Sequence, residues 1–141
     1  MSKIIVVDTN VVVSAMLGGA ASTRIIDASL TKRCIPLMGA ALFAEYEDLA
    51  NRDELFRACR LDKGEREELL DIFLAACRWT RIRFLWRPNL RDEGDNHLVE
   101  LAIAGNAELI VTRNIRDFRN AELRFPDIRI LTPEAFLREL P

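Results

Sequence analysis

The sequence predicts an α/β fold, a three-layer α-β-α arrangement in which helices cover both faces of a parallel sheet. Short apolar runs rich in β-branched residues alternate with amphipathic segments along the whole chain. The first run, residues 3–7, is continuously apolar, as in a strand buried on both faces. A length of 141 residues and a hydrophobic fraction of 50% predict a single domain over residues 1–141.

The first half of the chain supplies two strands and two helices to this fold. Asp8, Thr9 and Asn10 follow the first strand and are residues that favour the start of a helix. Ser22 is expected to cap a helix that ends near Lys32. The expected elements are a strand at 3–7, an apolar segment at 11–17, a helix at 22–32, a strand at 34–37 and a helix at 40–51.

The second half continues the alternation. Asp62 is expected to cap a long helix whose first turn is rich in glutamate, which suits the helix dipole. Asp95 or Asn96 is expected to start another, and Thr132-Pro133 to open the last. The remaining expected elements are a short helix at 53–59, a strand at 81–85, a helix end near 104, and strands at 108–112 and 128–131.

Composition excludes several classes of protein. A net charge of −2 argues against a globally basic nucleic-acid binder, although a local basic surface stays possible. With His97 as the single histidine and three scattered cysteines, a multi-histidine zinc site is excluded. The odd, widely spaced cysteines and the lack of an apolar run of ~20 residues indicate a reduced, cytoplasmic protein without a membrane helix.

Carboxylates follow several of the expected strands. Asp8, Asp92, Asp95 and Asp117 come after three of them, and Glu45 lies in the helix that follows the second. Because the active site of an open parallel sheet lies beyond the carboxyl ends of its strands, these acids are expected to converge. Converging carboxylates repel one another unless a hard cation such as Mg²⁺ or Mn²⁺ neutralises them, and such ions support phosphodiester hydrolysis. Each acid alone has a simpler interpretation, as a helix cap, a turn residue or a solvated side chain.

These acids lie in segments that resemble the PIN domain family. The segments are IIVVDTNVVVSAML, ALFAEYEDL with Glu45, RDEGDNHLVELAIAGNAELIVTRN, and TRNIRDF, and their order spans residues 3 to about 137. The resemblance implies a five-stranded parallel sheet in the strand order 3-2-1-4-5. It also implies a Mg²⁺- or Mn²⁺-dependent ribonuclease with one or two ions, similar to the VapC-like toxins of bacterial toxin–antitoxin pairs.

Residue by residue, the resemblance makes Asp8, Glu45, Asp95 and Asp117 the catalytic acids. The implied metal ligands are Asp8, Asp95, Asp117 and Asp92, and the implied site-ordering residues are Asn10, Thr112 and Asn114. Two departures stand out: the family often has Pro-x-Asp-Asn where this chain has Glu93-Gly94-Asp95-Asn96, and many members have Asp where this chain has Asn114. Since Asn carries no charge, the second metal site is expected to be weak. His97 has no role that the resemblance carries over, and is expected behind the site or on the surface.

Arginines beside the acids suggest how RNA is held. Arg113, Arg116 and Arg91 are expected to contact phosphates, although alternating arginines also fit the solvent side of an edge strand. The resemblance implies an antitoxin partner, with the apolar helices at 22–32 and 40–59 as its candidate groove; a homodimer is also expected. Two alternatives stay open: a housekeeping PIN nuclease in RNA processing, and a non-catalytic PIN-like module that binds RNA or protein. A haloacid-dehalogenase-like phosphatase is disfavoured because its Asp-x-Asp motif would need Asp at position 10.

Overall fold

The computed structural model describes residues 2–82 and 96–140, with the side chains of residues 120 and 123 left aside. Its centre is a five-stranded sheet in the order β3-β2-β1-β4-β5, in which every neighbouring pair is parallel. The strands are β1 (Lys3–Val7), β2 (Cys34–Met38), β3 (Arg78–Trp79), β4 (Leu109–Val111) and β5 (Arg129–Leu131). The predicted fold class and strand order are therefore confirmed.

The central strand β1 is buried over its last three residues. Its residues Ile5, Val6 and Val7 are at most 1% exposed, and β1 pairs with β2 on one side and with β4 on the other. Ile5 lies opposite Leu109, and Val7 lies opposite Val111. A strand segment that is covered on both faces has to be continuously apolar, as the sequence is from Ile4 to Val7, whereas Lys3 at the start of β1 is only half-buried.

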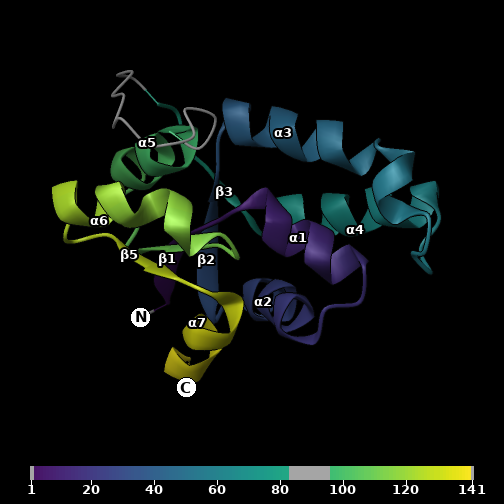
Figure 1. Cartoon of the computed structure of the whole chain (residues 1–141), viewed down its shortest axis with the longest axis horizontal. Coiled ribbons are helices and arrows are strands. Elements are labelled where there is room, and N and C mark those ends of the chain that lie inside the picture. Colours follow the sequence, from purple (N-terminus) through teal and green to yellow (C-terminus); the bar gives the residue numbers. More distant parts are fainter. Residues whose placement is uncertain (1, 83–95, 141) are drawn as a thin grey trace.

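Helices lie on both sides of this sheet, with α5 on one side and α2 and α4 on the other (Figure 1). The helices are α1 (Thr9–Met16), α2 (Ala20–Leu30), α3 (Ala40–Ala50), α4 (Lys63–Ala76), α5 (Asn96–Ala104), α6 (Arg119–Arg124) and α7 (Pro133–Glu139). Two short 3₁₀ turns, η1 (Asp53–Phe56) and η3 (Ile115–Phe118), complete the described elements. Within these residues no single helix is long and apolar enough to cross a membrane; α1 and α2 together fit by length and composition, but the chain bends by 109° between them.

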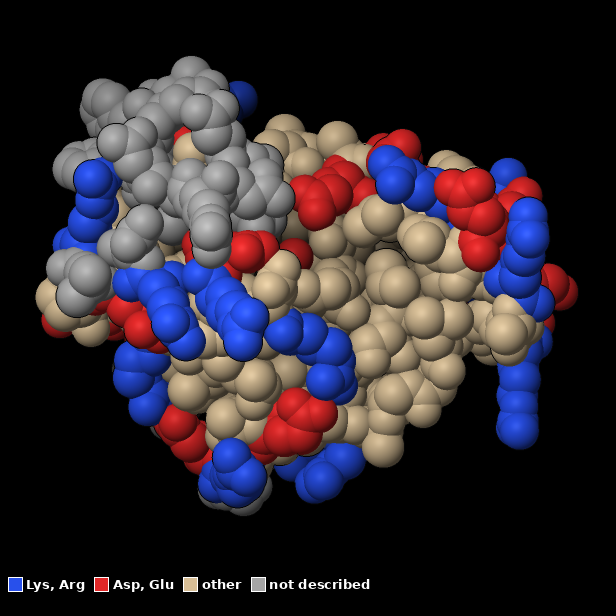
Figure 2. Space-filling model, viewed as in Figure 1, with Lys and Arg blue, Asp and Glu red and all other residues tan. Residues whose placement is uncertain are grey.

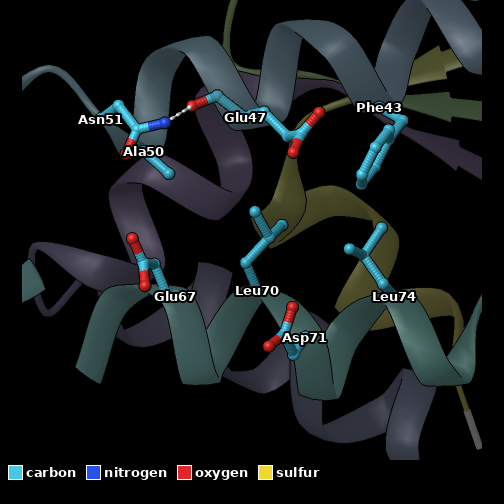
Figure 3. A pocket seen from close by; sticks show the side chains of 8 residues that line it. All are labelled: Phe43, Glu47, Ala50, Asn51, Glu67, Leu70, Asp71 and Leu74. Atoms are coloured by element: carbon cyan, nitrogen blue, oxygen red, sulfur yellow. Dashed lines mark hydrogen bonds between the residues drawn. The ribbon is translucent and has the colours of Figure 1, made fainter. Parts of the chain in front are cut away.

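A hollow of about 200 Å³ separates parts of α3 and α4. Figure 3 shows its apolar floor and the carboxylates at its rim; its lining includes Phe43, Leu70 and Leu74 together with Glu47, Glu67 and Asp71. None of the predicted site residues lines this hollow, so the predicted chemistry has to be located elsewhere.

Three local predictions are wrong. The expected strand at 81–85 is replaced by β3, because the chain leaving α4 meets its partners Leu37 and Met38 already at Arg78 and Trp79. Arg81 and Ile82 lie outside the strand, and 83–85 lie outside the described residues. The expected helix at 53–59 is only the 3₁₀ turn η1.

The third wrong prediction concerns the cap of α2. Gly19 occupies the cap position, and Ser22 lies inside the helix, fully buried. The hydroxyl of Ser22 instead accepts a hydrogen bond of 3.1 Å from Arg113, a residue 91 positions away. Ser22 therefore makes a tertiary contact and does not cap the helix.

The start of α4 is the best-defined helix end. The Asp62 carboxylate accepts a hydrogen bond from the Glu65 backbone, and the Glu65 side chain accepts one from the Asp62 backbone, which is a complete capping box. Directly after it, the buried Arg66 donates to Asp53 and to the Leu61 carbonyl, and its guanidinium lies 4.4 Å from the centre of the Phe56 ring. The cap thus fixes the point at which η1 and α4 are joined.

We expect Asp62→Ala to lower the free energy of unfolding by about 1 kcal/mol, because the backbone N–H of Glu65 loses its acceptor. Urea denaturation followed by circular dichroism measures this change. Asp71→Ala, at an exposed position inside the same helix, is the matched control and is expected to change stability little. Equal stability of the two variants would contradict the importance of the cap.

Candidate active site

Two predicted site residues, Asp8 and Thr112, lie directly after β1 and β4 at the carboxyl ends of these strands. Asp8 follows β1 directly, and its backbone N–H continues the ladder by donating to the Val111 carbonyl at 2.9 Å. Thr112 follows β4 directly and is fully buried, while Asp8 is 5% exposed. Parallel neighbours that end at the same level place these two side chains together, as the rule for open sheets predicts.

Two hydrogen bonds to the same oxygen fix the position of the Asp8 carboxylate relative to the end of β4. The Thr112 hydroxyl donates to Asp8 Oδ2 at 2.8 Å, and the Asn10 amide donates to the same oxygen at 3.3 Å. The Asn10 amide also reaches Thr112 Oγ1, and its carbonyl oxygen accepts from the Arg113 backbone. Asn10 and Thr112 therefore lie where the resemblance expects site-ordering residues.

Glu45 approaches the same place from α3. The neighbouring Tyr46 is buried and donates a 2.6 Å hydrogen bond from its hydroxyl to the Val7 carbonyl, which ties α3 to the end of β1. The Thr9 hydroxyl then lies 2.8 Å from Glu45 Oε1 and 3.3 Å from Asp8 Oδ1. One hydroxyl thus stands between two carboxylates, and its single proton serves the nearer one, Glu45.

The second oxygen of Glu45 is held by His97, whose Nε2 lies 2.7 Å from Glu45 Oε2. His97 is the second residue of α5, so this contact joins a third element to the site. Sequence reasoning gave no role to His97 and did not single out Thr9 as a partner of Glu45. The only available signals were that Thr9 lies between two predicted site residues and that His97 follows the stretch containing Asp95 and Asn96.

The two carboxylates have opposite pKa shifts. Burial raises the pKa of Asp8 above its ordinary value and the charge of Glu45 raises it further, against the hydrogen bond from Thr112. For Glu45, the hydrogen bond from His97 is the largest cause of a lowered pKa, and the bond from Thr9 adds to it. Glu45 is therefore held as an anion beside an Asp8 whose charge is disfavoured.

Asp117 belongs to the same hydrogen-bonded network, one step further from Asp8. The Asn114 backbone donates to Thr112 Oγ1 at 3.0 Å, and the Asn114 side-chain amide donates to the Asp117 carboxylate. Asp117 lies in η3 and is partly exposed. Asn114 adds no charge to the site and here orients Asp117 through its side-chain amide.

The predicted arginines have different surroundings. The Arg113 guanidinium donates to Glu134 of α7 and to Ser22 of α2, so it ties these helices to the end of β4. Arg116 is exposed, and no ion pair of its side chain is found in the described part of the chain. Figure 2 shows blue Lys and Arg side chains in a band near η3 and α6, close to red acidic ones. Arg91, Asp92 and Asp95 lie outside the described residues, and their roles stay predictions.

The described donors suit a hard divalent cation. Asp8 and Glu45 are close enough to perturb each other, and among residues 2–82 and 96–140 no Lys or Arg pairs with either of them. All the side-chain oxygens are of the kind that Mg²⁺ and Mn²⁺ accept. No group of three or more metal-binding side chains is complete within those residues.

Known proteins provide an independent comparison with this geometry. The chain is similar to a crystal structure of VapBC2 from Rickettsia felis bound to a DNA fragment from their promoter, with a TM-score of 0.63 and 20% identity. That match covers 92% of this chain and 98% of the other. No curated protein matches the chain. A family model described as PIN domain matches residues 4–116, which is most of the sequence and includes Asp8, Glu45 and Thr112. The chain therefore belongs to the PIN domain family.

Proposed function

We propose that this protein is a Mg²⁺- or Mn²⁺-dependent endoribonuclease that hydrolyses phosphodiester bonds of single-stranded RNA. The single observation that carries the proposal is the pair of carboxylates, Asp8 and Glu45, that share the Thr9 hydroxyl without a Lys or Arg side chain paired with either of them in the described structure. Placing these two carboxylates together does not stabilise the fold, because burial and repulsion by Glu45 both oppose the charged state of Asp8. A bound cation accounts for the arrangement, and the chain has the PIN fold.

In the proposed reaction, Asp8, Asp117, Asp95 and Asp92 hold the cation, one or two ions in number. The cation supplies Lewis-acid stabilisation of the phosphodiester and activation of water. Thr112 and Asn10 keep the Asp8 carboxylate turned toward the site through hydrogen bonds to its Oδ2. Glu45 stays ionised because of its hydrogen bonds from Thr9 and His97, so it can accept a hydrogen bond from a water molecule beside Asp8.

RNA is proposed to lie over the band of arginines near η3 and α6. Arg116 is two residues from the Thr112–Asn114 turn and exposed, which makes it available for a phosphate. Arg113 contributes differently than expected, since its guanidinium is already bonded to Glu134 and Ser22. We therefore assign phosphate binding to Arg116 and Arg91. Arg113 is proposed to bind phosphate only through the N–H groups that do not donate to Glu134 and Ser22.

A protein partner is the second part of the proposal. The solved structure that is similar to this chain is a VapBC2 assembly bound to promoter DNA. By analogy, we propose that this chain is the toxin of a toxin–antitoxin pair and that an antitoxin blocks the site. A housekeeping nuclease would have the same chemistry without the partner, and a non-catalytic module would have the fold without metal-dependent cleavage.

Asp8→Asn is expected to reduce Mn²⁺-dependent cleavage of a single-stranded RNA pool about a hundredfold or more, because a ligand charge is removed at the reacting centre. Gel analysis of labelled RNA, with and without EDTA, measures the loss. Asp27→Asn, an exposed position on α2, is the control and is expected to cleave like the unaltered protein. Undiminished cleavage by Asp8→Asn would contradict the proposed site.

The same substitution is expected to stabilise the metal-free protein. When folding raises the pKa of a carboxyl, the folded protein loses stability as the pH rises through and above the ordinary pKa of that group. The pKa of Asp8 is raised, so its ionised form destabilises the fold at neutral pH. Asn retains a carbonyl for Thr112 and places an amide beside the Thr9 oxygen. Thermal denaturation at pH 7 in EDTA should show a higher Tm for Asp8→Asn than for the unaltered protein.

Addition of Mn²⁺ should reverse that order. Saturation to about 100 times the dissociation constant stabilises a binding protein by about 2.7 kcal/mol, so the Tm of the unaltered protein should rise and that of Asp8→Asn should not. Equal shifts in the two proteins would mean that Mn²⁺ binds elsewhere. No shift in either would favour the non-catalytic module.

A further inference from the structure

His97 is the one histidine of the chain, and its side chain contacts the proposed catalytic residue Glu45. The sequence alone did not predict this contact. We propose that His97 is a positioning residue, which donates a hydrogen bond from Nε2 to Glu45 Oε2 and so holds the Glu45 carboxylate beside Asp8. The contact itself is a feature of the fold, whereas its effect on cleavage rests on the function proposed above.

Glu45 needs such a restraint. Its side chain has three rotatable bonds, is 35% exposed, and lies next to the charge of Asp8, which repels it. Left alone, the carboxylate would gain solvation and lose repulsion by turning outward. The structure instead holds one oxygen by Thr9 at 2.8 Å and the other by His97 at 2.7 Å. These two hydrogen bonds, from α1 and from α5, fix both the position and the plane of the Glu45 carboxylate.

The second ring nitrogen of His97 indicates which form of the ring makes this contact. Nδ1 is buried and has no hydrogen-bond partner among the described residues. A proton on Nδ1 would therefore be a buried N–H without an acceptor, which costs about 1–3 kcal/mol. The neutral ring with its proton on Nε2 avoids this cost and still donates to Glu45.

A neutral donor has a consequence that a lysine or arginine at this place would not have. A cationic side chain would neutralise Glu45 and compete with a metal ion for the negative charge near Asp8. The imidazole orients the carboxylate and leaves its charge in place. The lowered pKa of Glu45, caused first by this hydrogen bond, is consistent with a contact that favours the ionised carboxylate.

The contact can be observed directly, without metal or substrate. Because the chain has one histidine, protein labelled with ¹⁵N-histidine gives the nitrogen spectrum of His97 alone. The proposed contact predicts a proton on Nε2. Glu45→Gln should shift the Nε2 signal, whereas Glu47→Gln, an exposed position on the same helix that lines the α3–α4 hollow, should leave it unchanged. An Nε2 without a proton, or a spectrum insensitive to Glu45→Gln, would overturn the proposed contact.

The role in cleavage is tested by two substitutions of His97. His97→Leu keeps bulk but removes the donor, and it should lower kcat about 10–100-fold with little change in KM for RNA, as expected for loss of an outer contact that orients a site group. His97→Gln carries an amide that reaches the place of Nε2, and it should recover most of the activity. A purely structural role would be affected equally by both, and their Tm values report whether each is folded.

The outcomes separate this proposal from the function on which it rests. Full activity of His97→Leu in a preparation whose Asp8→Asn variant is inactive would overturn the positioning role and leave the nuclease standing. Equal losses in His97→Gln and His97→Leu would also overturn it. If the unaltered protein cleaves no RNA with any divalent metal, the proposed function fails, and the nitrogen spectrum still decides whether His97 holds Glu45.

Discussion

The buried carboxylate of Asp8 is the constraint on which the rest of the site depends. It stands where the central strand β1 ends, and the fold gives it hydrogen bonds from Thr112 and Asn10 but no cationic partner in the described residues. Around it, α3 is tied to β1 by Tyr46, and Glu45 is brought toward the same point. The neighbouring elements therefore raise the free energy of the ionised Asp8 side chain in the folded protein. Selection for stability alone would favour an arrangement that lowers it. A cation resolves this cost, and the function then follows from the same interaction that destabilises the metal-free fold.

Much of this arrangement could be predicted because it depends on the ends of parallel strands. Asp8 and Thr112 follow strands that the apolar runs at 3–7 and 108–112 reveal, and neighbouring parallel strands end at one edge of the sheet. The cap of α4 at Asp62 and the cap of α7 at Thr132 were likewise visible, since each depends on residues within one helical turn. Local signals were sufficient wherever the partner is near in sequence or fixed by the sheet.

Contacts between distant elements could not be predicted in the same way. The role of His97 depends on how α5 packs near α3, and nothing in the residues around it encodes that distance. Arg113 looked like a free cation in the sequence, but its partners Glu134 and Ser22 come from α7 and α2. The third strand begins at Arg78 because Leu37 and Met38 determine its register, while the alternating pattern at 81–85 suggested a later start. The short helices η3 and α6 have too few turns to show an amphipathic period.

The central claim is that Asp8 and Glu45 are arranged around a divalent cation. Anomalous diffraction from crystals of the protein grown with Mn²⁺ tests it most directly, because the ion is located independently of any activity. The account predicts an anomalous peak in direct contact with an Asp8 carboxylate oxygen, and no such peak in crystals of Asp8→Asn. A fully soaked crystal with no peak at Asp8, or with Glu45 and Asp8 turned away from each other, would contradict it.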